Sequence, residues 1–192
     1  MVPQLSLRQR NRLQAMRLVQ VTAVDMFEAE GFDATTIEAI ANACGVSPST
    51  IYRHFSTKEN IVLWDERDLI IDAELGERLG RQPAIQAFRD TVVVGLAERD
   101  DRELFLRRLG LIYSEPSIWA AAAHRDREDR AELAIAIASV SGHKHPSLAD
   151  ESVAAVCLAA LDVALEHWQR DEGRTPLAEL INESIHAVTN TA

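Results

Sequence analysis

The segment from Ser47 to Lys58 is rich in hydroxyl, imidazole and basic side chains, the types that contact phosphates and base edges. Ser47 and Pro48 predict the start of a short helix, because serine is a favoured N-cap and proline fits the first helical turn. Ile51 and Phe55 lie four residues apart and share a face that we expect to be buried. The other side chains then lie on outer faces: Pro48, Ser49, Thr50, Tyr52, Arg53 and His54. A short helix with its N-terminus presented outward suits the major groove of DNA.

A second short helix precedes this one and ends at a glycine. Thr35 and Glu38 form a capping-box pattern, so we expect the helix to begin at Thr36. Its buried face consists of Ile37, Ile40 and Ala41. Gly45 can adopt the left-handed conformation that ends a helix without steric cost. A helix, a tight turn and a second helix together predict a helix-turn-helix.

A third helix follows directly. Ser56 and Glu59 repeat the capping-box pattern, which predicts a long helix from about Thr57 to Leu79 with Lys58 in its first turn. A cation is unfavourable at that end of the helix dipole. We therefore expect an anionic partner for Lys58, such as a DNA phosphate.

The order TTIEAIANACGVSPSTIYRHFSTKENI resembles the DNA-binding signature of the tetracycline-repressor (TetR) family of bacterial transcription regulators, and the resemblance covers roughly residues 10 to 64. The turn glycine, the Ser-Pro cap, Ile-Tyr-x-His-Phe and x-x-Lys-Glu occur at the family's spacing. The resemblance implies base contacts near Ser47, Pro48, Ser49 and Thr50 and phosphate contacts by Thr36, Tyr52, His54 and Lys58. Arg53 faces either phosphate or solvent on this interpretation.

Composition predicts an all-α protein with two parts. Ala, Leu, Glu and Arg dominate between Gly, Pro and Ser punctuation, and alternating period-2 runs are nearly absent. We expect a three-helix DNA-binding head at residues 1–56 and a helical-bundle effector and dimerisation domain at 57–192. The net charge of −10 falls on the second part, because residues 1–60 carry six basic and six acidic side chains. Four arginines precede the first acidic residue: Arg8, Arg10, Arg12 and Arg17.

Apolar periodicity and turn residues predict the remaining helices. The expected ranges are a first helix from after Ser6 to Glu30, then 83–99, 101–114, 117–140, 149–168 and 176–188. The helix over 149–168 is apolar on most of its circumference, so it needs partners on several sides. We expect the last two helices to form a two-fold dimer interface, as the resemblance also implies. A buried core helix in a monomer is the alternative.

Aromatic and apolar residues of the second part are candidates for a small-molecule pocket between helices. They are Trp64, Phe88, Val92, Phe105, Leu109, Tyr113 and Trp119. Taken one by one, these residues more often serve core packing, but several large apolar groups in a helical domain can together enclose a cavity. Leu106-Arg107-Arg108-Leu109, Trp168 and Pro176-Leu177 are similar to the C-terminal domain of the mycofactocin-associated branch of the family, which implies acyl-CoA-type effectors. We expect an apolar or amphipathic ligand with any acidic group reaching an arginine.

The sequence thus predicts a ligand-responsive transcription regulator, a repressor released from a palindromic operator in double-stranded DNA. An activator or an effector-independent DNA binder is the alternative, and an all-helical enzyme is a remote one, since no catalytic motif is recognisable. His143-x-His145 lacks a third ligand, and Cys44 and Cys157 are far apart, so we expect no metal or cofactor. The absence of an 18-residue uncharged apolar run and of a signal pattern favours a cytoplasmic protein without a membrane span.

Overall fold

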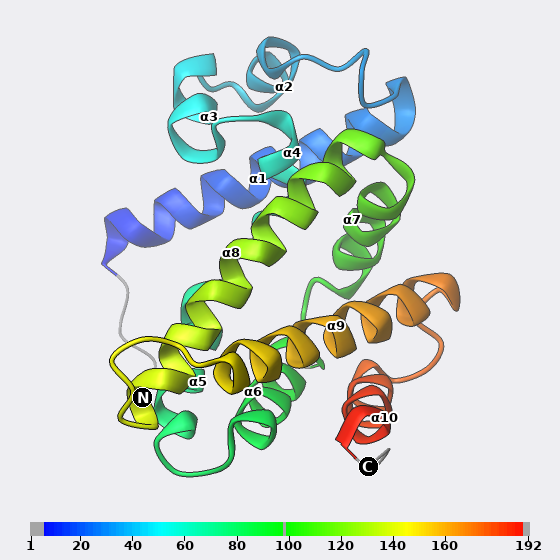
Figure 1. Cartoon of the computed structure of the whole chain (residues 1–192). Coiled ribbons are helices and arrows are strands. Elements are labelled where there is room, and N and C mark those ends of the chain that lie inside the picture. Colours follow the sequence, from blue (N-terminus) through cyan, green and yellow to red (C-terminus); the bar gives the residue numbers. More distant parts are fainter. Residues whose placement is uncertain (1–5, 98, 190–192) are drawn as a thin grey trace. The chain divides into compact units, whose positions relative to one another are not determined.

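The protein is all-α, as the sequence predicts. The computed structural model describes residues 6–97 and 99–189, without the side chains at positions 69, 70 and 97. Ten helices and no strand occur in these residues (Figure 1). None of the helices within this part of the chain is both long and apolar enough to cross a membrane.

The chain forms two compact units, which we call the head and the body. The head contains Met1–Glu66 together with Leu111–Ala121, and the body contains Arg67–Gly110 together with Ala122–Ala192. The first unit therefore continues ten residues beyond the boundary at residue 56 that the sequence predicts. It also includes residues 111–121, which contain the turn between two later helices.

Four helices make up most of the head: α1 (Leu7–Glu30), α2 (Ile37–Cys44), α3 (Pro48–Phe55) and α4 (Lys58–Leu63). A capping box between Ser6 and Gln9 starts α1, which ends at Glu30 as expected. The residues that the sequence predicts for the buried faces of α2 and α3 are buried, and Phe32 joins them, while Val46 is half-buried. The buried set is Phe32, Ile37, Ile40, Ala41, Ile51 and Phe55.

Six further helices follow: α5 (Asp68–Leu79), α6 (Ala84–Ala97), α7 (Arg102–Ser114), α8 (Pro116–Val140), α9 (Leu148–Arg170) and α10 (Leu177–Thr189). In the body, α9 packs along α10, and α6 packs against both α5 and α10. The Ser184 hydroxyl donates to the Ala160 carbonyl at 2.7 Å and ties α10 to α9. Gly95 lets α5 approach α6, because a Cβ at this position would lie 2.7 Å from the Ile71 side chain.

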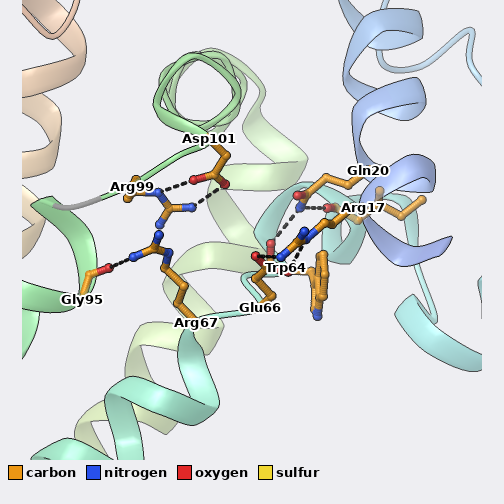
Figure 2. Close-up of polar contacts among 9 residues, drawn as sticks. Arg17, Gln20, Trp64, Glu66, Arg67, Gly95, Arg99 and Asp101 are labelled. Carbon is orange, nitrogen blue, oxygen red and sulfur yellow. Dashed lines mark hydrogen bonds and ion pairs between the residues drawn. The ribbon is translucent and has the colours of Figure 1, made fainter. Parts of the chain in front are cut away.

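The prediction of one long helix from Thr57 to Leu79 is wrong, because this range contains two separate helices, α4 and α5. The backbone of Trp64 is extended, with φ −62° and ψ 130°. The carbonyls at the end of α4 find a partner in Gln20, whose side-chain amide donates to Ile61 and Trp64 at 2.7 Å each (Figure 2). The Gln20 side chain thus supplies hydrogen bonds that backbone amides of a further helical turn would otherwise supply. No glycine or proline lies near this break, so the local sequence carries no signal for it.

Two predicted helix caps are displaced by one residue. Thr36 caps α2, with its hydroxyl accepting from the Ala39 amide at 3.1 Å, and Thr57 caps α4 in the same way from Asn60 at 3.3 Å. Thr35 is buried instead, and its hydroxyl donates to the Gly31 carbonyl at 2.9 Å. Ser56 has a φ of +64° and ends α3 rather than starting the next helix.

Candidate nucleic-acid interface

The turn between α2 and α3 has the geometry that the sequence predicts. Gly45 has a φ of +66°, in the left-handed region that glycine adopts without strain. The Val46 amide then donates to the Ala41 carbonyl at 3.0 Å, which closes the end of α2. The two helices are therefore joined by Gly45, Val46 and Ser47 alone.

The leading end of α3 carries a small cluster of hydroxyl groups. Ser47 is the N-cap, but its side chain accepts no hydrogen bond from a helix amide. Its Oγ lies 2.9 Å from both Ser49 Oγ and Thr50 Oγ1. Ser49 is exposed, while Pro48 and Thr50 are half-buried. This end of α3 can thus offer both hydroxyl groups and backbone N–H groups to a DNA groove.

Two of the predicted phosphate contacts, Thr36 and Tyr52, lie on accessible parts of α2 and α3, as does Arg53, for which the sequence left phosphate or solvent open. Thr36 is exposed at the start of α2, and Arg53 is exposed in the last turn of α3. Tyr52 is 47% exposed, and its hydroxyl donates weakly to Glu38 at 3.4 Å. All three side chains carry hydrogen-bond donors suited to phosphate oxygens.

His54 lies in a basic environment at the end of α3. Burial lowers the pKa of its imidazole, and the positive charges of Arg12 and Arg53 lower it further. Arg12, on the arginine-rich first half of α1, therefore acts electrostatically on the end of α3. A phosphate at this point would meet two guanidinium groups beside a neutral imidazole.

Lys58 differs from the other candidates, because its ammonium group has partners inside the head. It donates to the carbonyls of Phe32 at 2.7 Å and Thr35 at 2.9 Å. It also lies 4.4 Å from the centre of the Phe32 ring. These contacts account for a cation at the start of α4 without an external anion.

The seven candidate ligand-binding residues do not fall in one unit. Trp64, Tyr113 and Trp119 belong to the head, where Trp64 packs edge-on against Phe55 and Tyr113 packs against Trp119. The other four are buried in the body: Phe88, Val92, Phe105 and Leu109. In both units, some of these candidate residues therefore serve core packing. Core packing is the alternative role that the sequence left open.

An arginine that the sequence analysis did not single out lies against the buried aromatic residues of the body. The Arg99 guanidinium lies 3.9 Å from the centre of the Phe105 ring, and Phe105 packs on Trp168 at 5.6 Å. Asp101 accepts from Arg99 at 2.8 and 2.9 Å (Figure 2). Arg108 is buried, and its guanidinium lies 5.7 Å from the same ring.

A groove of about 900 Å³ lies in the body between α6, α9 and α10. None of the predicted ligand-binding residues lines it. Its lining is Pro83, Ala84, Ile85, Gln86, Arg89, Val153, Glu179, Asn182, Glu183, Ile185, His186 and Thr189. The lining therefore combines apolar side chains with charged and polar ones.

Several carboxyl groups of the body lie close together around Arg125. Arg125 forms an ion pair with Asp68 and lies 3.9 Å from Asp129. Burial raises the pKa of Asp129 to about 6, with Arg125 opposing the rise and Asp68, Asp126 and Glu132 adding to it. The pKa values of Asp72 and Asp126 are also raised, mainly by burial. Asp68 and Arg125 are 57 residues apart in the sequence, so no local pattern gives a signal for this cluster.

Gln20 is the residue in the head that the sequence analysis overlooked. It is 3% exposed and lies on the apolar stripe of α1, between Met16 and Ala23. A buried polar side chain needs hydrogen-bond partners. A glutamine on an apolar stripe is therefore the signal in the sequence that could have identified this contact.

Comparisons with known proteins agree with this geometry. Residues 21–63 match the family model described as bacterial regulatory proteins, tetR family, and residues 82–192 match the MftR C-terminal domain. The chain is 33% identical over 132 residues to the HTH-type transcriptional regulator TcmR of Streptomyces glaucescens, a match that covers 62% of this chain and 57% of TcmR. It is 25% identical over 171 residues to the putative mycofactocin biosynthesis transcriptional regulator MftR of Mycobacterium tuberculosis, covering 86% of this chain and 85% of MftR.

Solved structures share the fold. NalD, the secondary repressor of the MexAB-OprM multidrug efflux pump in Pseudomonas aeruginosa, has a TM-score of 0.56 at 18% identity, covering 93% of this chain and 96% of NalD. Thermus thermophilus FadR in complex with lauroyl-CoA has a TM-score of 0.53 at 20% identity, covering 91% and 93%. The family and these relatives are transcriptional regulators and not enzymes. With both of its parts matched, the chain belongs to the TetR family of DNA-binding transcriptional regulators.

Proposed function

We propose that the protein is a repressor that binds a palindromic operator in double-stranded DNA and is released by a small amphipathic effector. The observation that carries the DNA-binding part is the α2–α3 pair, with its three-residue connection and its exposed hydroxyl cluster at the start of α3. In this proposal α3 enters the major groove, and Ser47, Pro48, Ser49 and Thr50 lie nearest the base edges.

Phosphate contacts would come from the residues around this helix. Thr36, Tyr52, Arg53 and His54 supply hydroxyl, guanidinium and imidazole donors, and the head also exposes Arg8, Arg10 and Arg12 on α1. Lys58, the remaining residue that the sequence predicts to contact phosphate, donates to two carbonyls inside the head instead. The local excess of basic groups explains how a chain with net charge −10 can bind DNA.

Selection of bound sites from a random duplex library tests this function directly. We expect an enriched palindrome whose half-sites are about one helical turn apart or a multiple of that distance. Enrichment of a single half-site would contradict the two-fold arrangement, and no enrichment above a library control would contradict sequence-specific binding. An effect of the selected site on a reporter gene then separates repression from activation.

A dimer through α9 and α10 is part of the proposal, because one short recognition helix holds too few contacts alone. Between residues 152 and 167, the exposed positions of α9 recur at intervals of three and four residues, the spacing of a helix-pairing seam. Their side chains are Ser152, Val156, Ala159, Val163 and His167. Val156 is 37% exposed and Val163 is 47% exposed in the single chain, so α9 keeps an apolar face that a second copy would cover. This exposure favours the dimer over the monomer with a buried α9.

The effector is proposed to bind near the aromatic residues of the body, Phe88 and Phe105, with Val92 and Leu109 beside them. Arg99 and Arg108 lie against Phe105, so an acidic group on an apolar tail would find both an aromatic surface and a guanidinium. Trp64, Tyr113 and Trp119 remain candidates in the head. FadR of Thermus thermophilus, which shares only the fold, is known in complex with lauroyl-CoA, and this suggests a first probe.

Lauroyl-CoA, laurate and free coenzyme A can be titrated into the protein–operator complex while tryptophan fluorescence and DNA release are followed. A hundredfold loss of operator affinity requires about 2.7 kcal/mol of coupling between the two sites. Release by lauroyl-CoA and not by coenzyme A supports the amphipathic ligand. Binding of a probe without DNA release would favour the effector-independent alternative.

A further inference from the structure

The ammonium group of Lys58 is held like a bound cation in the turn between α1 and α2. Two backbone carbonyls, of Phe32 and Thr35, accept from it at 2.7 and 2.9 Å, and the Phe32 ring lies 4.4 Å away. Lys58 is half-buried at the first position of α4. Charge-assisted hydrogen bonds of this length are among the stronger polar contacts in proteins.

The turn that Lys58 contacts is itself firmly built. Phe32 is 3% exposed and packs on Phe27 at 4.8 Å. Thr35 is 1% exposed, and its hydroxyl donates to the Gly31 carbonyl at 2.9 Å. The next residue, Thr36, is the N-cap of α2. The position of Thr36 is therefore set by a turn that is fastened from both α1 and α4.

We propose that Lys58 is a positioning residue that links the start of α4 to the start of α2, rather than a direct phosphate contact. Two of its three N–H donors are used by carbonyls of the turn, and the same nitrogen lies 4.4 Å from the centre of the Phe32 ring. The inference rests on the proposed DNA binding by the head. It adds that the Lys58 side chain couples a movement of α4 to the DNA-facing end of α2.

The charge on Lys58 also has an explanation within the head. A cation at the first position of a helix is unfavourable for the helix dipole. Here the partial negative charges of two carbonyl oxygens lie opposite it, at hydrogen-bond distance. The positive charge that suggested a phosphate partner thus already has two carbonyl partners before DNA binds.

Amine labelling tests the contact without any DNA. The chain has two lysines, Lys58 and Lys144, and Lys144 is exposed in the loop before α9. We expect Lys58 of the full-length native protein to react with an amine reagent roughly tenfold or more slowly than Lys144, because its hydrogen bonds must open first. Adding the selected operator should leave the Lys58 rate unchanged. Fast labelling that DNA suppresses would overturn the proposal.

Variants test the positioning role. Lys58→Met keeps the apolar stem and should lower affinity for specific and random duplexes alike, by roughly tenfold, the loss expected for a removed charge-assisted pair. The slope of log affinity against log salt should stay at the wild-type value. Lys58→Arg should restore most of the affinity, because a guanidinium can donate to both carbonyls. Lys144→Met removes the same charge elsewhere and should change neither quantity.

A fall in the salt slope of about 0.9 for each protomer in Lys58→Met would show a phosphate contact and overturn the proposal. Amide exchange separates positioning from general loss of stability. In Lys58→Met we expect faster exchange at the first turn of α2 with unchanged exchange in α9; a uniform increase along the chain would contradict the specific link. If the wild-type protein binds no duplex, the proposed function fails, while the labelling result still tests the contact itself.

Discussion

The side-chain amide of Gln20 donates to the carbonyl of Trp64 at 2.7 Å and joins the middle of α1 to the point where α4 ends. The same amide donates to Ile61, so one side chain satisfies two carbonyls at the helix terminus. Arg17, one turn earlier on α1, pairs with Glu66 at 2.5 Å. The segment that leads out of α4 is therefore fixed to α1 at two successive points.

Gln20→Leu should lower the free energy of unfolding by about 2 kcal/mol, because it leaves two carbonyls near the core without their donor. Gln14→Leu is the matched control, since Gln14 lies on the exposed side of the same helix and should change stability by less than about 0.5 kcal/mol. Urea unfolding followed by circular dichroism measures both. Equal stability of the two variants would mean that the Gln20 contacts contribute nothing net.

Ser49 and Thr50 should set part of the base preference, because they lie at the leading end of α3. Their side chains are short, so direct readout should be sparse and shape should contribute. Ser49→Ala and Thr50→Val should each change which base pairs are enriched in duplex selection, with a penalty of about 1 kcal/mol at the affected position. Identical site preferences, with equal losses of affinity on all duplexes, would place these residues away from the bases.

Val156 and Val163 should lie in the dimer interface on α9. Substituting both by glutamate would place like charges opposite each other across a two-fold axis and should give monomers at concentrations where the wild type is a dimer. Ile135→Glu on α8 is the control, because Ile135 is 58% exposed and lies outside the proposed interface. Light scattering after gel filtration gives the mass of each variant. A dimeric double variant would require another interface.

Asp129 should make the protein less stable as the pH rises through about 6. Its pKa is raised from 3.8 to about 6 in the folded state, so the folded state holds the proton more tightly than the unfolded chain. The associated stability is fully present below pH 3.8 and is lost as the pH rises to about 6. The side chain is 47% exposed, so solvent screening reduces the effect to about 1 kcal/mol.

Asp129→Asn should therefore be more stable than the wild type at pH 7, and the difference should vanish near pH 4. Thermal melting over this range measures it. Glu128→Gln is the control, because the Glu128 side chain is 64% exposed on the same helix. This substitution removes the same negative charge as Asp129→Asn. A similar gain in both variants at pH 7 would point to net charge rather than to the environment of Asp129.

Patterns that are local in sequence predicted much of this structure. The helix predicted over 149–168 occurs as α9, which starts at a capping box of Ser147 and Asp150, and Gly45 ends α2 as expected. Such signals succeed because a cap or a left-handed glycine acts within four residues. The same reasoning located α3 and its buried residues, Ile51 and Phe55.

Interactions between distant residues explain what the sequence did not reveal. Gln20 and Trp64 are 44 residues apart, and the break after α4 depends on that contact rather than on a local helix breaker. Lys58 was expected to need a phosphate because its carbonyl partners, Phe32 and Thr35, do not show in a linear pattern. Arg99 was missed for the same reason, since only folding brings it over Phe105.

The shortness of α4 has a consequence for how the head folds. Six residues are far below the roughly 12 that an isolated helix needs to persist in water, so α4 forms only when α1 supplies Gln20 and the turn receives Lys58. The stability of this helix therefore depends on its docking against α1. A truncated chain that stops at residue 56 would lose the Trp64 ring from the face of Phe55 and should populate a loosely packed, protease-sensitive state.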